Sequence, residues 1–151
     1  MNEAAKPSTI KIRVAESRDA AGLAALAGQL GYPSTREQVE ARLRGMAGDQ
    51  ERIVFVAEHA GGELAGYADL FLLRTIGADA RVEVAGLVVD EASRSRGVGA
   101  MLMARAEDWA REKGCAVIGL RSNVIREGAH RFYENLGYRV NKTQKSFRKA
   151  L

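Results

Sequence analysis

The hydrophobic pattern of the first third of the chain predicts one strand and two helices. Residues 9–15 alternate between apolar and polar side chains, as expected for a half-buried strand. Apolar residues then recur at helical spacing up to Leu30, and again after Ser34, which forms a candidate capping box with Glu37. The run Gly31-Tyr32-Pro33 separates the two helices, because glycine and proline interrupt helical backbone.

Further strands and helices are predicted along the rest of the chain. The predicted strands, which are rich in β-branched and aromatic residues or alternate in polarity, cover residues 53–57, 63–73, 81–89 and 116–120. The predicted helices, with apolar residues at helical spacing, cover residues 97–113 and 127–136. Gly61 and Gly62 turn the first two of these strands into a hairpin. From Tyr138 onward we expect one or two terminal strands.

Strands and helices in this order predict a mixed α/β (α+β) fold. We expect a central, mixed and mostly antiparallel twisted sheet of six or seven strands, flanked by four helices. The early hairpin supplies antiparallel neighbours, and the later strand–helix–strand connections supply parallel ones. A chain of 151 residues has the length of one ordinary domain. Residues 1–151 are therefore expected to form a single domain, with a flexible N-terminus over residues 1–8.

Composition narrows the classes of protein that remain. No apolar run approaches the roughly 18 residues of a membrane span, and residues 1–9 are too short and polar for a signal peptide, so we expect no membrane partner and a cytoplasmic protein. The single cysteine, Cys115, excludes an intrachain disulfide, and with only two histidines beside it no metal site is expected. A net charge of +4 is all that supports a nucleic-acid-binding domain, and the basic residues are dispersed, so no nucleic acid is expected.

A basic, glycine-containing turn precedes the helix predicted over residues 97–113. Its sequence is Arg94-Ser95-Arg96-Gly97-Val98-Gly99. The first N–H groups of a helix have no intrahelical acceptors, the helix dipole places partial positive charge there, and glycine lets an anion approach the backbone. The turn lacks the third glycine of the dinucleotide fingerprint and the lysine of a P-loop. By itself it fits either a phosphate site or an ordinary exposed loop.

The turn and the segments around it resemble the GNAT superfamily of N-acetyltransferases. The pyrophosphate loop of that family has Gln or Arg, two residues, Gly, one residue, then Gly or Ala, and Arg94, Gly97 and Gly99 match it. Residues 82–90 resemble the family's fourth strand, and residues 129–138 resemble its fourth helix and the turn that follows. The resemblance implies the GNAT fold and an enzyme that transfers the acetyl group of acetyl-CoA directly to a primary amine.

The resemblance also implies how coenzyme A binds. In the family, backbone N–H groups of the turn hold the pyrophosphate, and the pantetheine arm pairs with the fourth strand where a bulge separates it from the fifth. Gly86 is a residue that would ease such a bulge. Asn123 resembles a family position that hydrogen-bonds the pantetheine, and a turn asparagine that caps the next helix explains it equally well. The implied cofactor-binding residues are Leu87, Val88, Val89, Arg94, Arg96, Gly97, Val98, Gly99, Ala100 and Asn123.

Two catalytic groups are implied in the same way. Tyr133 matches the family's tyrosine near the CoA sulfur, which acts as a general acid on the thiolate leaving group; the alternative is an aromatic core residue. The acceptor amine must lose a proton, and Glu83 lies where many relatives carry a glutamate base; the alternative is a surface glutamate. Further candidates for the base are Asp69, Glu58 and His130.

The identity of the acceptor is left open by the sequence. In the family it is set by the first two helices and their loop, here residues 30–37, and by residues 74–80, where Tyr32 and Asp79 are candidate lining residues. A small-molecule or peptide amine is expected. The alternative function is a CoA-binding module without turnover, a sensor or an interaction subunit. Pairing through the terminal strands is compatible with a homodimer.

Overall fold

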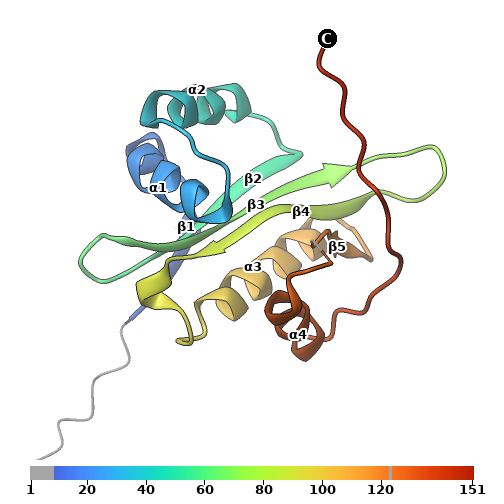
Figure 1. Ribbon diagram of the computed structural model, residues 1–151. Helices are drawn as coiled ribbons and strands as arrows, with labels where there is room; N and C mark the ends of the chain where they lie inside the picture. The colour runs from blue at the N-terminus through green and yellow to red at the C-terminus, as the bar shows by residue number, and fades with distance from the viewer. Residues whose placement is uncertain (1–8, 123) are drawn as a thin grey trace, which may run out of the picture. The chain divides into compact units, whose positions relative to one another are not determined.

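The computed structural model describes residues 9–122 and 124–151, which form two compact units, one ending at Leu120 and the other covering Arg121–Leu151 (Figure 1). The strands are β1 (Lys11–Val14), β2 (Arg52–Glu58), β3 (Leu64–Leu73), β4 (Arg81–Val89) and β5 (Ile118–Leu120). The α-helices are α1 (Ala20–Leu30), α2 (Arg36–Met46), α3 (Val98–Glu112) and α4 (Glu127–Asn135). Two short 3-10 helices are η1 (Ser17–Asp19) and η2 (Glu91–Ser93).

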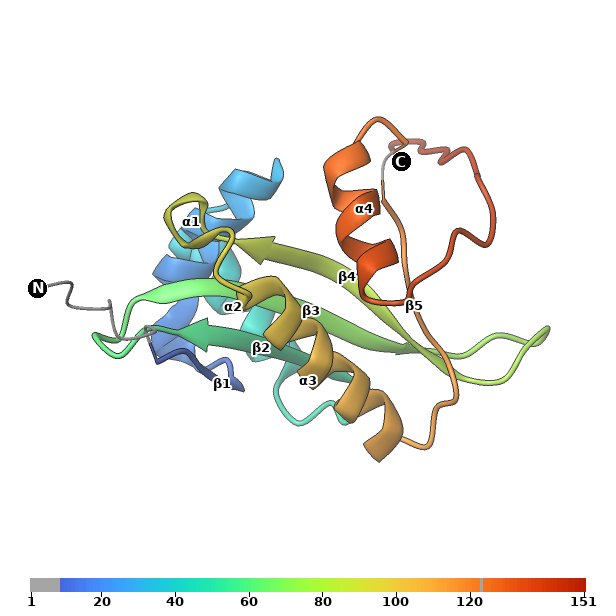
Figure 2. The same ribbon diagram turned by 90° about the horizontal axis from the view of Figure 1, so that it is seen from below.

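The first unit is built on one mixed sheet with the strand order β1-β2-β3-β4-β5. Neighbours among the first four strands are antiparallel, and β5 runs parallel to β4. Helices α1 and α2 cover one face of this sheet and α3 covers the other (Figures 1 and 2). The predicted mixed, mostly antiparallel sheet and the four α-helices are thereby confirmed.

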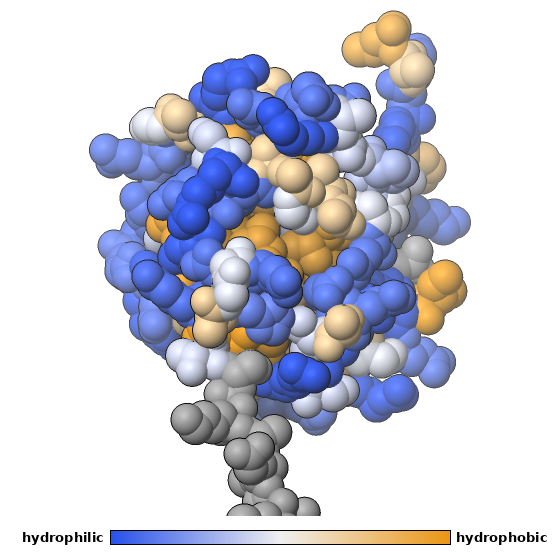
Figure 3. All heavy atoms as spheres, turned by 90° about the vertical axis from the view of Figure 1, so that its left-hand side faces the viewer, coloured by the Kyte–Doolittle hydropathy of each residue, from blue (hydrophilic) through white to orange (hydrophobic). Residues whose placement is uncertain are grey.

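Buried apolar side chains cover both faces of the sheet. The face toward α1 and α2 carries a cluster that includes Leu23, Val39 and Val56. On the other face, Leu102 and Met103 of α3 are completely buried. Each such side chain contributes about 1.5–3 kcal/mol when it leaves water, so burial of these faces is what holds the helices to the sheet. At the surface, Figure 3 shows mainly hydrophilic side chains, with apolar atoms gathered near the middle of the face in view.

The number of strands corrects the prediction, because the described residues form five rather than six or seven. The expected terminal strands after Tyr138 are absent from residues 138–151. All side chains of residues 139–151 are exposed, including those of Val140 and Phe147. A strand needs a hydrogen-bonded neighbour and a face to bury. Isolated apolar residues among basic ones supply neither within this segment.

The cap of α2 also differs from the prediction by one residue. Thr35 rather than Ser34 is the N-cap: its Oγ1 accepts from the Gln38 N–H at 3.1 Å, and the Gln38 side chain accepts from the Thr35 N–H at 3.0 Å. The Ser34 hydroxyl lies instead 3.2 Å from the Tyr32 carbonyl and 2.9 Å from an Arg42 nitrogen. The capping box is therefore Thr35 with Gln38, which leaves Ser34 available to position Arg42.

Gly66 of β3 packs tightly against the backbone of β4. A Cβ at this position would collide with the Val88 carbonyl oxygen and lie 3.2 Å from the Leu102 side chain. Gly66→Ala is therefore expected to lower the free energy of unfolding by about 1–3 kcal/mol, measured by urea denaturation. The matched control is Gly45→Ala in α2, where a Cβ meets no atom within 4 Å and alanine favours the helix. Equal losses in both variants would contradict the close approach.

Candidate active site

The turn between β4 and α3 presents free backbone N–H groups at the start of a helix. The first backbone hydrogen bond of α3 runs from the Met101 N–H to the Gly97 carbonyl at 3.0 Å. The N–H groups of Val98, Gly99 and Ala100 precede that bond, so they have no intrahelical acceptor. Gly97 has a φ of 79°, in the left-handed region that glycine adopts without strain. These N–H groups and the helix dipole make the turn suitable for an anion.

Two arginines add positive charge to this turn. Arg94 and Arg96 are both exposed, and neither forms an ion pair with a carboxylate of the described residues. Arg94 Nε donates to the Val89 carbonyl at 3.3 Å, which links the turn to the end of β4. The charge of both guanidinium groups therefore remains available to a bound phosphate.

Side-chain hydrogen bonds at the two ends of η2 hold the backbone that leads into the turn. Ser93 is 2% exposed, and its hydroxyl lies 2.9 Å from His59 Nε2 in the turn between β2 and β3. The Gln29 side chain of α1 donates to Asp90 Oδ1 at 2.7 Å and accepts from the Glu91 N–H at 3.1 Å. The backbone leading into the turn is thus fixed before any ligand binds, which reduces the entropy that a ligand must remove.

A bulge interrupts β4 just before its last residues. The pairing with β3 passes from Asp69–Gly86 to Leu70–Val84, so Ala85 is an extra residue in β4. The bulge was expected beside Gly86, and it forms at the neighbouring residue. It also places Gly86 opposite Asp69, on the face of the sheet that α1 covers, because one inserted residue reverses the alternation of side chains.

Beyond the bulge, one edge of β4 has no paired strand within residues 9–120. Strand β5 pairs only with Val82, Glu83 and Val84. The Asp90 N–H donates to the Ala65 carbonyl on the β3 side at 2.8 Å. Backbone polar groups of a strand alternate in direction, so those of Leu87 and Val89 point toward the unpaired edge. This edge leads directly into the Arg94–Gly99 turn.

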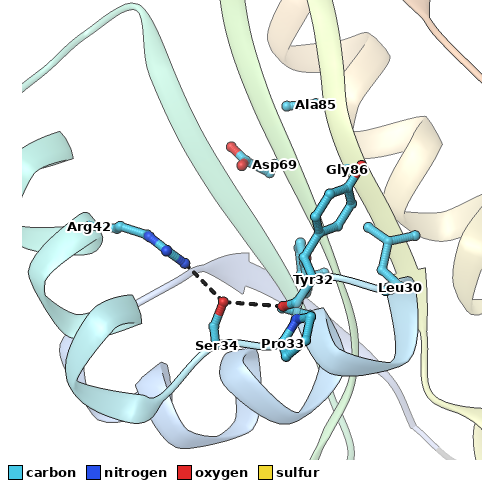
Figure 4. A pocket seen from close by; sticks show the side chains of 11 residues that line it. Leu30, Tyr32, Pro33, Ser34, Arg42, Asp69, Ala85 and Gly86 are labelled. Carbon is cyan, nitrogen blue, oxygen red and sulfur yellow. Dashed lines mark hydrogen bonds between the residues drawn. The ribbon is translucent and has the colours of Figure 1, made fainter. Parts of the chain in front are cut away.

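A pocket of about 500 Å³ opens on the α1–α2 side of the bulge (Figure 4). We call it the Tyr32 pocket. Asp69 and Gly86 from the sheet line it, together with Tyr32 from the loop between α1 and α2 and Arg42 from α2. Its size lies within the range of small-molecule sites. Of the two candidate lining residues, Tyr32 lines this pocket and Asp79 does not.

Asp69 is the most unusual side chain of the pocket. Its Oδ1 is buried and has no hydrogen-bond partner within the described part of the chain. Burial raises the pKa of Asp69, and the positive charge of Arg52 opposes that shift. Burial also raises the pKa of the neighbouring Tyr67 to about 12, assisted by Asp69 and by Tyr32. An unpaired buried oxygen costs about 1–3 kcal/mol, so its presence points to a ligand that completes it.

Glu83, the base expected from the sequence, already has a partner. Its Oε1 accepts from Arg81 Nε at 2.8 Å, and its side chain is 12% exposed. A Cβ at Gly119 of β5 would lie 3.0 Å from the same oxygen. The register places Glu83 and Asp69 on the same face of the sheet, on opposite sides of the bulge. Of these two carboxylates, only Asp69 lines the Tyr32 pocket.

Tyr133, the expected general acid, lies on α4 in the second unit. Its ring packs edge-to-face against Phe132 and Tyr138, with centroids 5.1 and 6.1 Å away. Burial raises the pKa of the Tyr133 phenol, and the charge of Arg126 lowers it by a smaller amount. The phenol therefore stays protonated at neutral pH, as a proton donor must.

The remaining sequence predictions have different outcomes. Asn123 lies outside the described residues. No cluster of three or more potential metal ligands occurs in residues 9–122 and 124–151. None of the helices in these ranges is long and apolar enough to cross a membrane.

The sequence did not indicate Arg42 and Tyr67 as site residues, and it gave Asp69 only as a weaker candidate for the base. The sequence feature that pointed to Asp69 was its position as the one acidic residue within the otherwise uncharged, largely apolar stretch 64–73.

Comparison with known proteins identifies the family. Residues 21–138 match the model of the acetyltransferase (GNAT) family. The chain is 41% identical over 58 residues to N-acetyltransferase YhdJ of Bacillus subtilis, which is 38% of this chain and 41% of that protein. It is 39% identical over 69 residues to the aminoalkylphosphonate N-acetyltransferase of Salmonella typhimurium, 46% of this chain and 44% of that protein. The similarity thus spans less than half the length of these two relatives.

A solved structure of an acetyltransferase has the same fold as this chain. An aminoglycoside N-acetyltransferase solved in complex with CoA superposes with a TM-score of 0.84 at 21% identity, covering 98% of this chain and 99% of that chain. At this identity the likeness shows a shared fold. The chain belongs to the GNAT family of acetyltransferases. The predicted family is thereby confirmed.

Proposed function

We propose that this protein transfers the acetyl group of acetyl-CoA to a primary amine. The observation that carries the proposal is the unpaired edge of β4 that runs into a basic turn with free N–H groups at the start of α3. The CoA complex of the aminoglycoside N-acetyltransferase with the same fold supports acetyl-CoA as the co-substrate. In this proposal the turn amides from Arg96 to Ala100 hold the pyrophosphate, and Leu87 and Val89 pair with the pantetheine arm beside Val88.

Direct transfer requires one proton acceptor and one proton donor. The amine nitrogen forms a bond to the acetyl carbon, the carbon–sulfur bond breaks, and the departing thiolate takes a proton from Tyr133. The second proton of the attacking nitrogen restores Tyr133. A backbone N–H of β4 next to Val88 is proposed to stabilise the oxyanion. Glu83 and Asp69 are the candidate bases, and the pairing of Glu83 with Arg81 favours Asp69.

The acceptor is proposed to bind in the Tyr32 pocket, which lies beside the bulge. The named relatives act on different amines, an aminoalkylphosphonate in one case and an aminoglycoside in the other. Both kinds of amine therefore belong in a first panel of acceptors, with release of free thiol as the assay.

Binding of the cofactor is the first test, by calorimetric titration of the protein with acetyl-CoA, CoA and ADP. Saturable binding of acetyl-CoA and CoA is expected. Gly97→Val is expected to weaken that binding, because a β-branched residue is strained at a φ of 79° and its side chain occupies the anion's approach. The control is Gly128→Val in α4, where the added Cβ meets no atom within 4 Å and φ is not positive. Wild-type affinity in Gly97→Val would overturn the assignment of the turn.

A further inference from the structure

Two ionisable side chains of opposite sign line the Tyr32 pocket, and neither forms an ion pair within the described residues. Asp69 offers a buried carboxylate oxygen without a partner. Arg42 offers a guanidinium group that donates to the Ser34 hydroxyl at 2.9 Å and forms no ion pair with any carboxylate in the described parts of the chain. The same helix supplies a contrast, because Arg36 and Arg44 both pair with Glu40. Figure 4 shows Asp69 and Arg42 among the side chains that surround the space beside the Tyr32 ring.

The two groups differ in what they can bind. A carboxylate oxygen accepts hydrogen bonds, and a primary ammonium group carries three donors, so an amine suits Asp69. A guanidinium group has five donors, and four of those on Arg42 are free for an acidic group of planar or tetrahedral shape. Ser34 fixes the direction of the guanidinium group, since its hydroxyl is itself tied to the Tyr32 carbonyl.

Asp69 lies next to the unpaired edge of β4, which is where an amine must be placed to meet the acetyl group. Asp69 pairs with Gly86, and the next residue, Leu87, begins the unpaired edge of β4 that is proposed to hold the pantetheine arm. Arg42 is on α2, at the exposed rim of the pocket. An acceptor that spans the pocket therefore has its amine toward the sheet and its other end toward α2.

We propose that the acceptor is a small zwitterionic amine, whose ammonium group binds Asp69 and whose acidic group binds Arg42. The inference rests on the proposed acetyl transfer and names the class of its acceptor. Asp69 takes one proton from the ammonium group, which leaves a neutral amine that can attack the acetyl carbon. Asp69 then releases this proton to water after the product leaves. The acidic group is a carboxylate or a phosphonate, which share two or more acceptor oxygens.

The test compares acceptors that differ only in the acidic group. β-Alanine and β-alaninamide have the same primary amine and nearly the same shape, but only the first carries a negative charge. Calorimetric titration, with and without CoA present, is expected to give at least about tenfold tighter binding of β-alanine to the wild-type protein, because a hydrogen bond between two charged groups is stronger than one to a neutral amide. 2-Aminoethylphosphonic acid, titrated in parallel, distinguishes a preference for phosphonate from one for carboxylate.

Two variants assign the preference to Arg42. Arg42→Gln is expected to reduce the ratio of the two affinities to about one. The matched control, Arg44→Gln, removes the same charge from α2 outside the pocket lining and is expected to leave the ratio unchanged. Asp69→Asn is expected to weaken both compounds by the same factor, since both carry the ammonium group. Thermal unfolding verifies that all three variants are folded.

The outcomes separate this inference from the proposed function. Equal affinities of the acid and the amide for the wild-type protein, or a ratio that survives in Arg42→Gln, would overturn the zwitterionic acceptor even if acetyl-CoA binds and amines are acetylated. Failure of acetyl-CoA to bind would overturn the proposed function, while the titrations without CoA still decide whether Arg42 selects an acidic group.

Discussion

Replacing Asp69 by asparagine is expected to lower kcat/KM for acetyl transfer by ~10²–10⁴-fold, the usual contribution of a positioned base. The substitution preserves the shape of the side chain and removes its ability to take a proton. Glu83→Gln is the matched comparison, because Glu83 lies on the same face of the sheet with its carboxylate paired to Arg81. A large loss in Glu83→Gln with a small one in Asp69→Asn would return the role of the base to Glu83.

The pH profile gives an independent check on Asp69. A base works only when deprotonated, and burial raises the pKa of Asp69, so kcat/KM is expected to rise with pH through a value above that of an ordinary aspartate. The ionisable groups around it are Tyr67 on the same strand, Tyr32 in the α1–α2 loop, Arg52 on β2 and Arg42 on α2.

In Asp69→Asn the rise of kcat/KM that reflects deprotonation of Asp69 is expected to disappear from the pH profile. The rate should then rise with pH up to the pKa of the acceptor amine, about 10, because hydroxide must remove the proton. Burial raises the pKa of Tyr67 to about 12, so ionisation of Tyr67 does not interfere with this range. An acidic limb that is unchanged in Asp69→Asn would show that another group is the base.

Tyr133→Phe is expected to reduce kcat by on the order of tenfold to a thousandfold while leaving the affinity for acetyl-CoA nearly unchanged. The hydroxyl is the proposed donor to the thiolate, and the ring contacts with Phe132 and Tyr138 do not depend on it. Burst-free steady-state kinetics with a saturating amine, measured by thiol release, give kcat directly. Calorimetry gives the affinity.

The neighbouring ring supplies the control for this prediction. Tyr138→Phe removes a hydroxyl from the same aromatic group in the second unit, and its kcat is expected to stay close to that of the wild type. Because burial raises the pKa of Tyr133, the wild-type rate should fall only above the pH at which an ordinary tyrosine ionises, and this alkaline decrease should vanish in Tyr133→Phe. Equal kcat values in wild type and Tyr133→Phe would remove Tyr133 from the mechanism.

The turn before α3 could be predicted from the sequence, because its residues are consecutive. The Arg94–Gly99 turn combines glycine at a helix start with two arginines, and each property follows from the residue types themselves. The strand before it and the helix after it follow from their hydrophobic periods. The terminal strands were predicted wrongly, because alternation alone does not tell whether a neighbouring strand is present to pair with residues 138–151.

The amino-acid sequence by itself determined the family, the order of the helices and most strands, and the position of the basic, glycine-containing turn before α3, because these depend on residues within a few positions of one another. Only the tertiary structure decided which carboxylate lines the pocket. Asp69 and Arg42 are 27 positions apart, and their approach depends on packing of α1 and α2 against the sheet. The bulge at Ala85 depends on the register with β3, which no local pattern specifies.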